Sequence, residues 1–276
     1  MIAFPNCKIN LGLHIVAKRA DGYHDLETVF YPLPFYDVLE IIQSSAIEKD
    51  PKLTVSGLKL ETGSAANLCV RAYQLLKKDF PDLPLVEIFL HKNIPIGAGL
   101  GGGSADAALM LSLLNQKFSL GIGEDQLLNY ALQLGSDCPF FVVNKPCFAT
   151  GRGEQVEPVD LNLSPCALVL VNPRIHIETK WAFAQIKSTF PRQNLRSIIS
   201  HPVYEWKHSL QNDFEQPVFS AHPEIAAIKN KLYETGALYA AMSGSGSSVF
   251  AIFNRPWLRK NQDVFPAAYF VKELSL

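Results

Sequence analysis

A glycine-rich segment constrains the fold and chemistry of this chain more than any other feature of its sequence. Five of the seven residues at 97–103 are glycine, and the segment lies between an alternating stretch at 85–91 and an Ala- and Leu-rich stretch that begins at Ser104. Glycine permits a positive φ and carries no Cβ, so successive backbone N–H groups can converge on an anion. The positive end of a helix that begins near Ser104 would strengthen this attraction. We therefore expect a phosphate-binding loop between a strand and a helix.

Three familiar phosphate-binding patterns do not describe this loop. Gly97, Gly99 and Gly102 satisfy the spacing GxGxxG, but the acidic residues about 20 positions later, Glu124 and Asp125, open a helix instead of ending a second strand. A Walker A loop needs a lysine before its Ser or Thr, and here glycine precedes Ser104 directly. The HRD and DFG triplets of protein kinases are absent. The loop belongs to another class of phosphate-binding protein.

Composition excludes several other classes. The 276 residues carry a formal net charge of −1 and are 48% hydrophobic, which is typical of a folded protein of about two domains. This balance provides no broad positive field for nucleic acid or anionic membranes. We find no apolar run near the roughly 20 residues that span a bilayer and no signal-peptide pattern, so we expect a cytoplasmic protein. The five cysteines contain no CxxC pair, which argues against disulfides and zinc.

Hydrophobic periodicity predicts a mixture of strands and helices. Without regular βαβ alternation, the pattern favours the α+β class. It changes after residue 151, and we expect two domains at 1–151 and 152–276. The predicted strands are 8–17, 25–33, 38–43, 53–56, 85–91, 167–171, 237–241 and 249–253, and the predicted helices are 67–78, 104–114, 124–134, 179–187 and 224–235.

Three segments resemble the motifs of the GHMP kinases (galactokinase, homoserine kinase, mevalonate kinase, phosphomevalonate kinase). Residues 95–104 (PIGAGLGGGS) resemble the second motif, while 5–11 (PNCKINL) and 242–247 (MSGSGS) resemble the first and third. The resemblance implies a two-domain GHMP kinase fold with the active site in the cleft between the domains. Four further segments resemble the branch that phosphorylates the 2-hydroxyl of 4-diphosphocytidyl-2-C-methyl-D-erythritol in the non-mevalonate isoprenoid pathway: 19–24 (RADGYH), 135–141 (GSDCPFF), 151–154 (GRGE) and 212–215 (NDFE).

The resemblance also assigns the reacting groups and the nucleotide site. Asp137 would accept the proton of the attacking hydroxyl, and Lys8 would keep that carboxylate ionised and offset charge on the phosphoryl group. Taken alone, Asp137 could be a helix cap and Lys8 an exposed strand end. The cofactor would be ATP with Mg²⁺. The expected ATP-binding residues are Asn67, Pro95, Ile96, Gly97, Ala98, Gly99, Leu100, Gly101, Gly102, Gly103 and Ser104.

The acceptor site is expected to recognise a cytidine diphosphate. By resemblance, Tyr23 stacks on the cytosine and His24 bonds its edge. Phe183 covers the opposite face, with Trp181 as the alternative ring. Asn67 could equally be a helix cap, and no role is assigned to residues 212–215. The remaining expected substrate-binding residues are Asn10, Gly244 and Ser245.

One departure and two alternatives remain open. The chain has Ser104-Ala105-Asp106 where Ser-Ser-Asp is commoner in the family, so Ser104 is the only hydroxyl there that could bind phosphate or Mg²⁺, or cap the helix. No metal ligand is firmly assigned. The acceptor could instead be homoserine or a mevalonate-like alcohol, although Tyr23 and His24 argue against it. A silent nucleotide-binding regulator should lack Lys8 and Asp137. The protein could be a monomer or a homodimer.

Overall fold

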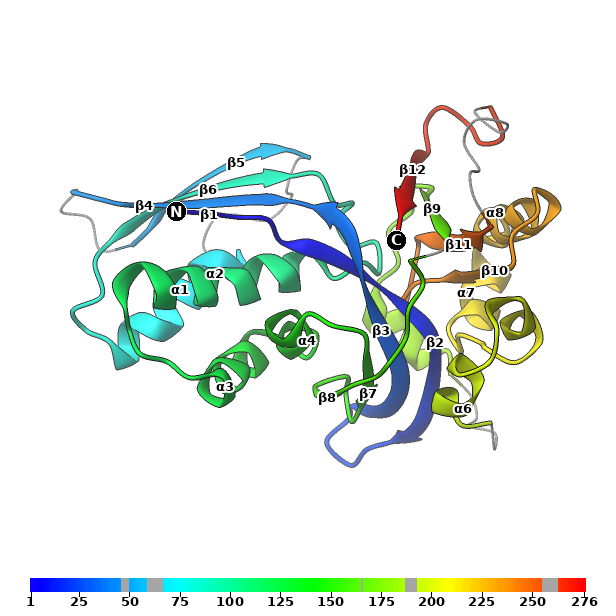
Figure 1. The fold of residues 1–276 in the computed structure, drawn as a ribbon, viewed down its shortest axis with the longest axis horizontal. Helices are drawn as coiled ribbons and strands as arrows, with labels where there is room; N and C mark the ends of the chain where they lie inside the picture. Colours follow the sequence, from blue (N-terminus) through cyan, green and yellow to red (C-terminus); the bar gives the residue numbers. More distant parts are fainter. Residues whose placement is uncertain (46–49, 59–66, 165, 187–192, 255–262) are drawn as a thin grey trace. The chain divides into compact units, whose positions relative to one another are not determined.

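The chain forms two compact units. The computed structural model describes residues 1–45, 50–58, 67–164, 166–186, 193–254 and 263–276 (Figure 1). Each unit is discontinuous along the sequence, and the expected domains at 1–151 and 152–276 stay a prediction. Unit 1 comprises Met1–Cys7, Phe35–Ile96 and Gly101–Lys145, and unit 2 comprises Lys8–Pro34, Gly97–Leu100 and Pro146–Leu276.

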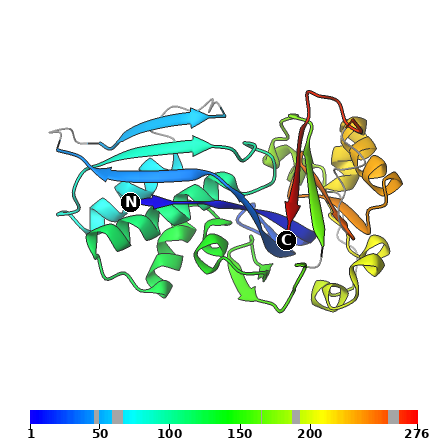
Figure 2. The same ribbon diagram turned by 45° about the horizontal axis from the view of Figure 1, so that its top comes forward.

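Unit 1 contains one four-stranded sheet with helices on one face (Figures 1 and 2). The strand order is β1-β4-β6-β5, in which β5 and β6 are parallel and the other pairs antiparallel. The parallel pair is joined through helix α1, as a βαβ connection requires. The elements are β1 (Ile2–Ala3), β4 (Val38–Gln43), β5 (Lys52–Gly57), β6 (Val86–Lys92), α1 (Leu68–Asp79), α2 (Gly102–Phe118), α3 (Glu124–Leu134) and α4 (Cys138–Val143).

Alternate residues of β6 form the sheet side of the unit 1 core. Val86, Ile88 and Leu90 are buried, and they cluster with apolar side chains of α1 and α2 such as Leu76 and Leu111. Side chains two apart in a strand share one face, so a single row of residues covers the helices. Several buried residues in the first half of α2 are small, and helices α1 and α4 pack against this helix.

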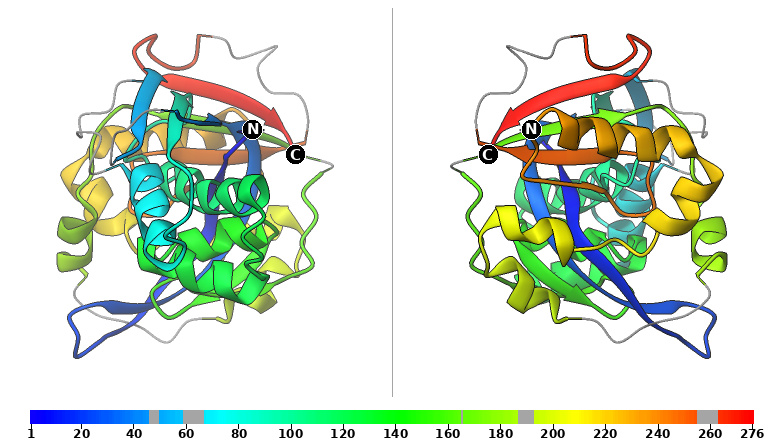
Figure 3. Two further views of the ribbon diagram at one scale, coloured as in Figure 1. Left: turned by 90° about the vertical axis from the view of Figure 1, so that its left-hand side faces the viewer. Right: turned by 90° about the vertical axis from the view of Figure 1, so that its right-hand side faces the viewer.

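Unit 2 contains two four-stranded sheets, ordered β2-β3-β7-β8 and β10-β11-β9-β12. Strand β9 is buried along its whole length, and helix α8 packs on β10 and β11 (Figure 3). The strands are β2 (Asn6–Lys18), β3 (His24–Tyr36), β7 (Cys147–Thr150), β8 (Gln155–Pro158), β9 (Ala167–Asn172), β10 (Tyr239–Met242), β11 (Val249–Phe253) and β12 (Phe270–Ser275). The helices are α5 (Thr179–Ala184), α6 (Leu195–Ile199), the 3₁₀ helix η2 (Val203–His208), α7 (Glu215–Ala221) and α8 (Pro223–Glu234).

The structure confirms the α+β class and every strand and helix predicted from periodicity, with shifted ends. Helix α2 is longer than its prediction at both ends, since it begins at Gly102 and continues to Phe118. The strand predicted at 237–241 is β10, which begins two residues later, after a turn. The helix predicted at 179–187 ends at Ala184, and residue 187 lies outside the described residues. The unpredicted elements are short or at sheet edges: β1, β7, β8, β12, α4, α6, η2 and α7.

Candidate active site

Strand β2 buries polar residues on the face opposite its core face. Residues 7, 9, 11, 13 and 15 are apolar and buried, as alternation requires. The intervening side chains of Asn6, Lys8, Asn10 and His14 are also buried, at 2–5% exposure. Burying a polar group costs free energy unless it forms hydrogen bonds. The polar side chains on this face therefore need hydrogen-bond partners on neighbouring segments. The arrangement excludes an exposed strand end as the explanation of Lys8.

A chain of hydrogen bonds fixes the Lys8 ammonium. Lys8 Nζ donates to Asn10 Oδ1 at 2.7 Å, and Asn10 Nδ2 donates to Thr28 Oγ1 at 3.0 Å. Thr28 Oγ1 then donates to the carbonyl of Gly12 at 2.5 Å. Lys8 Nζ also lies 4.6 Å from the centroid of the Phe30 ring. The result is a positive charge held in one position, as stabilisation of a phosphoryl group in transfer requires.

The first and third motifs contact the glycine loop directly within unit 2, and for the first motif Lys8 N donates to the Leu100 carbonyl at 2.9 Å. Ser243 Oγ donates to the Gly99 carbonyl at 2.8 Å and accepts from the Asn10 N–H at 3.3 Å. Ser248 N donates to the Ala98 carbonyl at 3.2 Å. A Cβ on Gly99 would lie 2.0 Å from the Ser243 carbonyl oxygen, so only glycine fits there. Three motifs far apart in sequence therefore meet around Ser243.

The glycine loop has the backbone geometry of an anion site. Gly97, Gly99 and Gly101 alternate with their neighbours in having φ of +62°, +77° and +70°. Alternating conformations of this kind turn successive N–H groups toward one point. Gly101 is the N-cap of α2 and has no side chain to bond the N–H groups of the first turn. Ser104 lies in that first turn and is not the cap, which leaves its hydroxyl to other partners.

Two of the residues predicted to bind a base, His24 and Phe183, are in contact in unit 2. His24 and Phe183 stack with ring centroids 4.8 Å apart and an interplanar angle of 16°, and the edge of Phe214 contacts Phe183. Trp181 instead contacts His222. Burial and the nearby Lys18 lower the pKa of His24, which favours the neutral imidazole at pH 7. Phe183, not Trp181, is therefore the ring beside His24.

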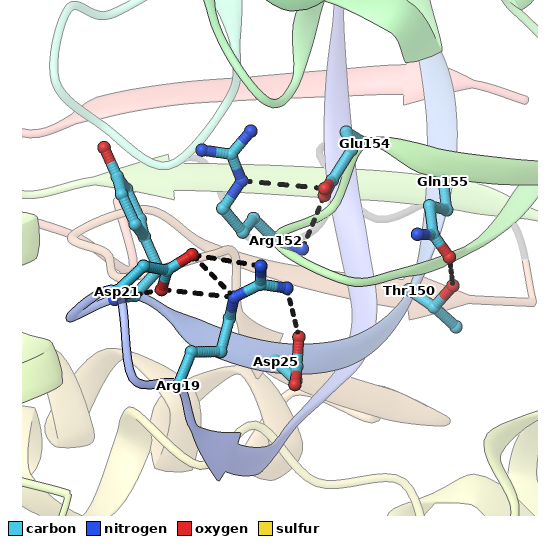
Figure 4. A network of polar contacts seen from close by, with 8 residues as sticks. Arg19, Asp21, Asp25, Thr150, Arg152, Glu154 and Gln155 are labelled. Carbon is cyan, nitrogen blue, oxygen red and sulfur yellow. Dashed lines mark hydrogen bonds and ion pairs between the residues drawn. The ribbon is translucent and has the colours of Figure 1, made fainter.

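Tyr23 lies on a turn that ion pairs hold in place. Its N–H donates to Asp21 at 3.1 Å, while Arg19 pairs with both Asp21 and Asp25 at 3.0 Å (Figure 4). The Arg152 guanidinium lies 4.8 Å from the centroid of the Tyr23 ring. Tyr23 is 54% exposed, so much of this residue is accessible to a ligand. Sequence analysis did not single out Arg152, although it belongs to the GRGE segment.

Unit 1 contributes Asp137 and Asn67. Asp137 occupies the N-cap position of α4, but its side chain makes no capping hydrogen bond, so the cap does not explain this residue. Asn67 does cap α1, accepting from the Cys69 N–H at 2.9 Å. Because Lys8 belongs to unit 2 and Asp137 to unit 1, their pairing stays a prediction.

Sequence analysis missed a buried charge cluster next to the loop. Lys92 Nζ donates to Asp37 and, at 2.7 Å, to Asp106 on α2. Asp37 also accepts from the N–H groups of Asn93 at 2.6 Å and Ile94 at 2.9 Å. Burial, opposed by Lys92 and reinforced by Asp37, raises the pKa of Asp106 to about 7. The cluster ties the segment before the loop to the helix after it. The one signal in the sequence was a lysine at the end of an apolar strand.

The described residues contain no helix with the length and apolar character of a membrane span. In the same part of the chain, no three His, Cys, Asp or Glu side chains gather as a metal site would need.

Comparison with known proteins assigns the family. The model for the GHMP kinases N terminal domain matches residues 67–145, and the GHMP kinases C terminal model matches 197–263. The chain belongs to the GHMP kinases. A Bacteroides fragilis protein named 4-diphosphocytidyl-2-C-methyl-D-erythritol kinase is 52% identical over all of both chains. A protein of the same name from Cytophaga hutchinsonii is 47% identical over 92% of this chain and 93% of its own.

Solved structures agree on the fold. The crystal structure of a 4-(cytidine 5'-diphospho)-2C-methyl-D-erythritol kinase has a TM-score of 0.82, at 28% identity over all of both chains. A mevalonate kinase structure has a TM-score of 0.74 at 12% identity, covering 99% of this chain and 98% of its own. At that identity it supports the fold alone. The predicted two-domain GHMP kinase fold is confirmed.

Proposed function

We propose that the protein transfers the γ-phosphoryl group of ATP to the 2-hydroxyl of 4-diphosphocytidyl-2-C-methyl-D-erythritol, in the non-mevalonate route to isoprenoid precursors. The observation that carries the proposal is 52% identity over the whole chain to a kinase with this substrate in its name. The stacked rings of His24 and Phe183 and the exposed Tyr23 support it, because homoserine and mevalonate contain no base that such rings would bind.

The reaction needs few chemical groups from the protein. The 2-hydroxyl oxygen forms a bond to the γ-phosphorus, the bond from that phosphorus to the β–γ bridging oxygen breaks, and ADP leaves. Asp137 accepts the hydroxyl proton. The Lys8 ammonium, held by Asn10 at 2.7 Å, offsets negative charge on the phosphoryl oxygens. We assign no further covalent chemistry to the chain.

ATP binds through the loop at 95–104 and the first turn of α2. The alternating φ angles at Gly97, Gly99 and Gly101 support this assignment. For Asn67, whose Oδ1 caps α1, we assign the nucleotide contact to the Nδ2 donor.

Mg²⁺ fits this environment because the ion keeps several waters and takes oxygen ligands mainly from phosphates, so few protein ligands are needed. The Ser104 hydroxyl is the side chain we assign to it. When bound, the ion would neutralise charge on the transferring phosphates.

The test is an ADP-release assay with three acceptors at equal concentration: 4-diphosphocytidyl-2-C-methyl-D-erythritol, homoserine and mevalonate. We expect turnover with the first alone. Turnover with either of the others would move the protein to another branch, and ATP binding without any turnover would favour a regulator.

A substitution checks the base-binding surface. Stacking on an aromatic ring contributes about 1–3 kcal/mol per base, so Tyr23→Ala should weaken cytidine diphosphate binding roughly 5- to 150-fold in calorimetric titration. Tyr204→Ala, which removes another exposed tyrosine of unit 2, is the matched control and should leave the affinity unchanged. If uridine diphosphate binds as well as its cytidine counterpart and Tyr23→Ala alters neither, no cytosine pocket exists.

A further inference from the structure

The NDFE segment at 212–215, without an assigned role so far, is tied to strand β2. Leu13 and Asn212 form a parallel β-bridge. Leu13 N donates to the Gln211 carbonyl, and Asp213 N donates back to the Leu13 carbonyl, each at 2.9 Å. The Asp213 carboxylate accepts from the Ile15 N–H at 2.8 Å. The segment is thus bonded to the strand that carries Lys8 and Asn10.

The buried Asn212 side chain also holds the third glycine motif. Its Nδ2 donates to the carbonyls of Met242 and Gly244, both at 2.8 Å, and its Oδ1 accepts from the Phe214 N–H at 3.0 Å. Both donors and the acceptor of the amide are therefore used. The two carbonyls belong to the residues before and after Ser243, so the amide fixes the backbone that carries this serine.

Glu215 adds a second anchor on the same backbone. Its Oε1 accepts from the Met242 N–H at 2.9 Å, and its Oε2 pairs with Lys229 on α8 at 2.6 Å. The end of β10 is consequently held by two side chains of one four-residue segment. A surface turn would not need this degree of fixation.

The third glycine motif, residues 242–247, contacts the residues that hold the Lys8 ammonium. Ser243 Oγ bonds the Asn10 N–H and the Gly99 carbonyl. A Cβ on Gly244 would lie 3.4 Å from Asn10 Oδ1, the atom that accepts from Lys8 Nζ. Asn212 therefore holds the peptide that packs against the acceptor of the Lys8 hydrogen bond.

We infer that Asn212 is a positioning residue for phosphoryl transfer, which fixes the Lys8 ammonium by clamping Met242 and Gly244. The inference rests on the proposed kinase function. Asn212 touches neither ATP nor acceptor in this role. Displacement of a reacting group by about 1 Å can cost roughly 10²-fold in rate, so a side chain at this remove can control kcat.

The test compares Asn212→Asp with wild type at pH 8. The carboxylate keeps the size and the Oδ1 acceptor but turns an oxygen toward two carbonyls, so the clamp opens. We expect kcat to fall about 10- to 100-fold while KM for ATP and for the acceptor changes less than about threefold. Burial against two carbonyl oxygens should raise the pKa of the introduced carboxyl, so more of it is protonated at pH 6, where it can donate to one carbonyl again and the ratio of variant to wild-type kcat should rise. If the loss came from unfolding alone, kcat per folded molecule would equal the wild-type value at both pH values.

Two further variants separate positioning from loss of fold. Asn212→Ser introduces no charge and should show the same loss of kcat. It takes the place of Asn212→Asp in the test if that variant does not fold. Ile228→Val, in the core of the same unit, should lower the melting temperature without changing kcat per folded molecule. Asn212 variants that keep more than about half of the wild-type kcat would overturn the inference. Inactive wild-type protein would instead refute the proposed function.

Discussion

Replacing Asp106 by asparagine removes a buried acid whose pKa the fold raises to about 7, mainly through burial. Lys92 opposes this shift, and the carboxylate of Asp37 on the other side of Lys92 reinforces it. The amide introduced by Asp106→Asn has nearly the same shape as the carboxyl group and can still accept from Lys92. The substitution therefore removes one titrating group from unit 1 while leaving its packing almost unchanged.

The direction and magnitude follow from proton linkage. In the unfolded chain an aspartate has a pKa of about 3.9, so between about pH 4 and pH 7 the folded protein holds a proton at Asp106 that the unfolded chain has lost. Stability from this group falls as pH rises through that window and is constant above it. Integration from pH 5 to pH 8 gives a loss of about 2 to 3 kcal/mol in the free energy of unfolding. Asp106→Asn should abolish this component.

The assay is urea unfolding of wild type and variant at pH 5, 6, 7 and 8. The difference in unfolding free energy between the two proteins should move in favour of Asp106→Asn by about 2 to 3 kcal/mol across this range, or roughly 5 °C in melting temperature. Asp82→Asn, at an exposed aspartate of the same unit, should show no such trend. Parallel pH profiles for wild type and Asp106→Asn would mean that the cluster does not raise the pKa of Asp106, and the account of it would be wrong.

Three further changes test the site. Asp137→Asn should lower kcat by about 10²- to 10⁴-fold with little change in calorimetric ATP affinity, and a variant with above about half of wild-type activity would exclude Asp137 as the base. Gly99→Ala places a Cβ 2.0 Å from a backbone oxygen, so ATP affinity should drop at least about tenfold, whereas Gly121→Ala, with a similar positive φ in open space, should leave it unchanged. Phe183→Ala should weaken cytidine diphosphate binding about 5-fold or more and Trp181→Ala much less; equal effects would refute the assignment of Phe183.

Hydrophobic periodicity was sufficient to predict the longer helices and strands, because each packs against a core through apolar residues at regular spacing. Helix α2 and strand β6 were recognisable from their spacing alone, since one face of each is buried. Strand β12, which among the described residues pairs with β9 alone, alternates weakly because it lies at a sheet edge. Helix α4 has only six residues and begins with Cys138-Pro139, too short for periodicity to register.

In the candidate site, some features could be predicted from the sequence and others could not. Glycine motifs could be found from the sequence because a backbone with positive φ, or one in close contact with another, admits almost no other residue. The cluster of Lys92, Asp37 and Asp106 could not, because the lysine and its acids are 55 and 14 residues apart and nothing in the spacing pairs them. Arg152 at Tyr23 and Asn212 at Gly244 are long-range contacts of the same kind.

Strand β2 shows that a sequence can predict which polar side chains need hydrogen-bond partners without predicting which residues those partners are. A strand whose odd residues enter a core would ordinarily place polar side chains in water on its other face. Here that face carries Lys8 and Asn10 beside apolar neighbours, and both are buried. Asn10 is satisfied by residues 18 and 233 positions away, which only the folded chain brings to it. The position of the Lys8 ammonium therefore depends on segments near the C-terminal end of the sequence. A substitution in one of them, at Asn212, should lower kcat even where the protein still folds.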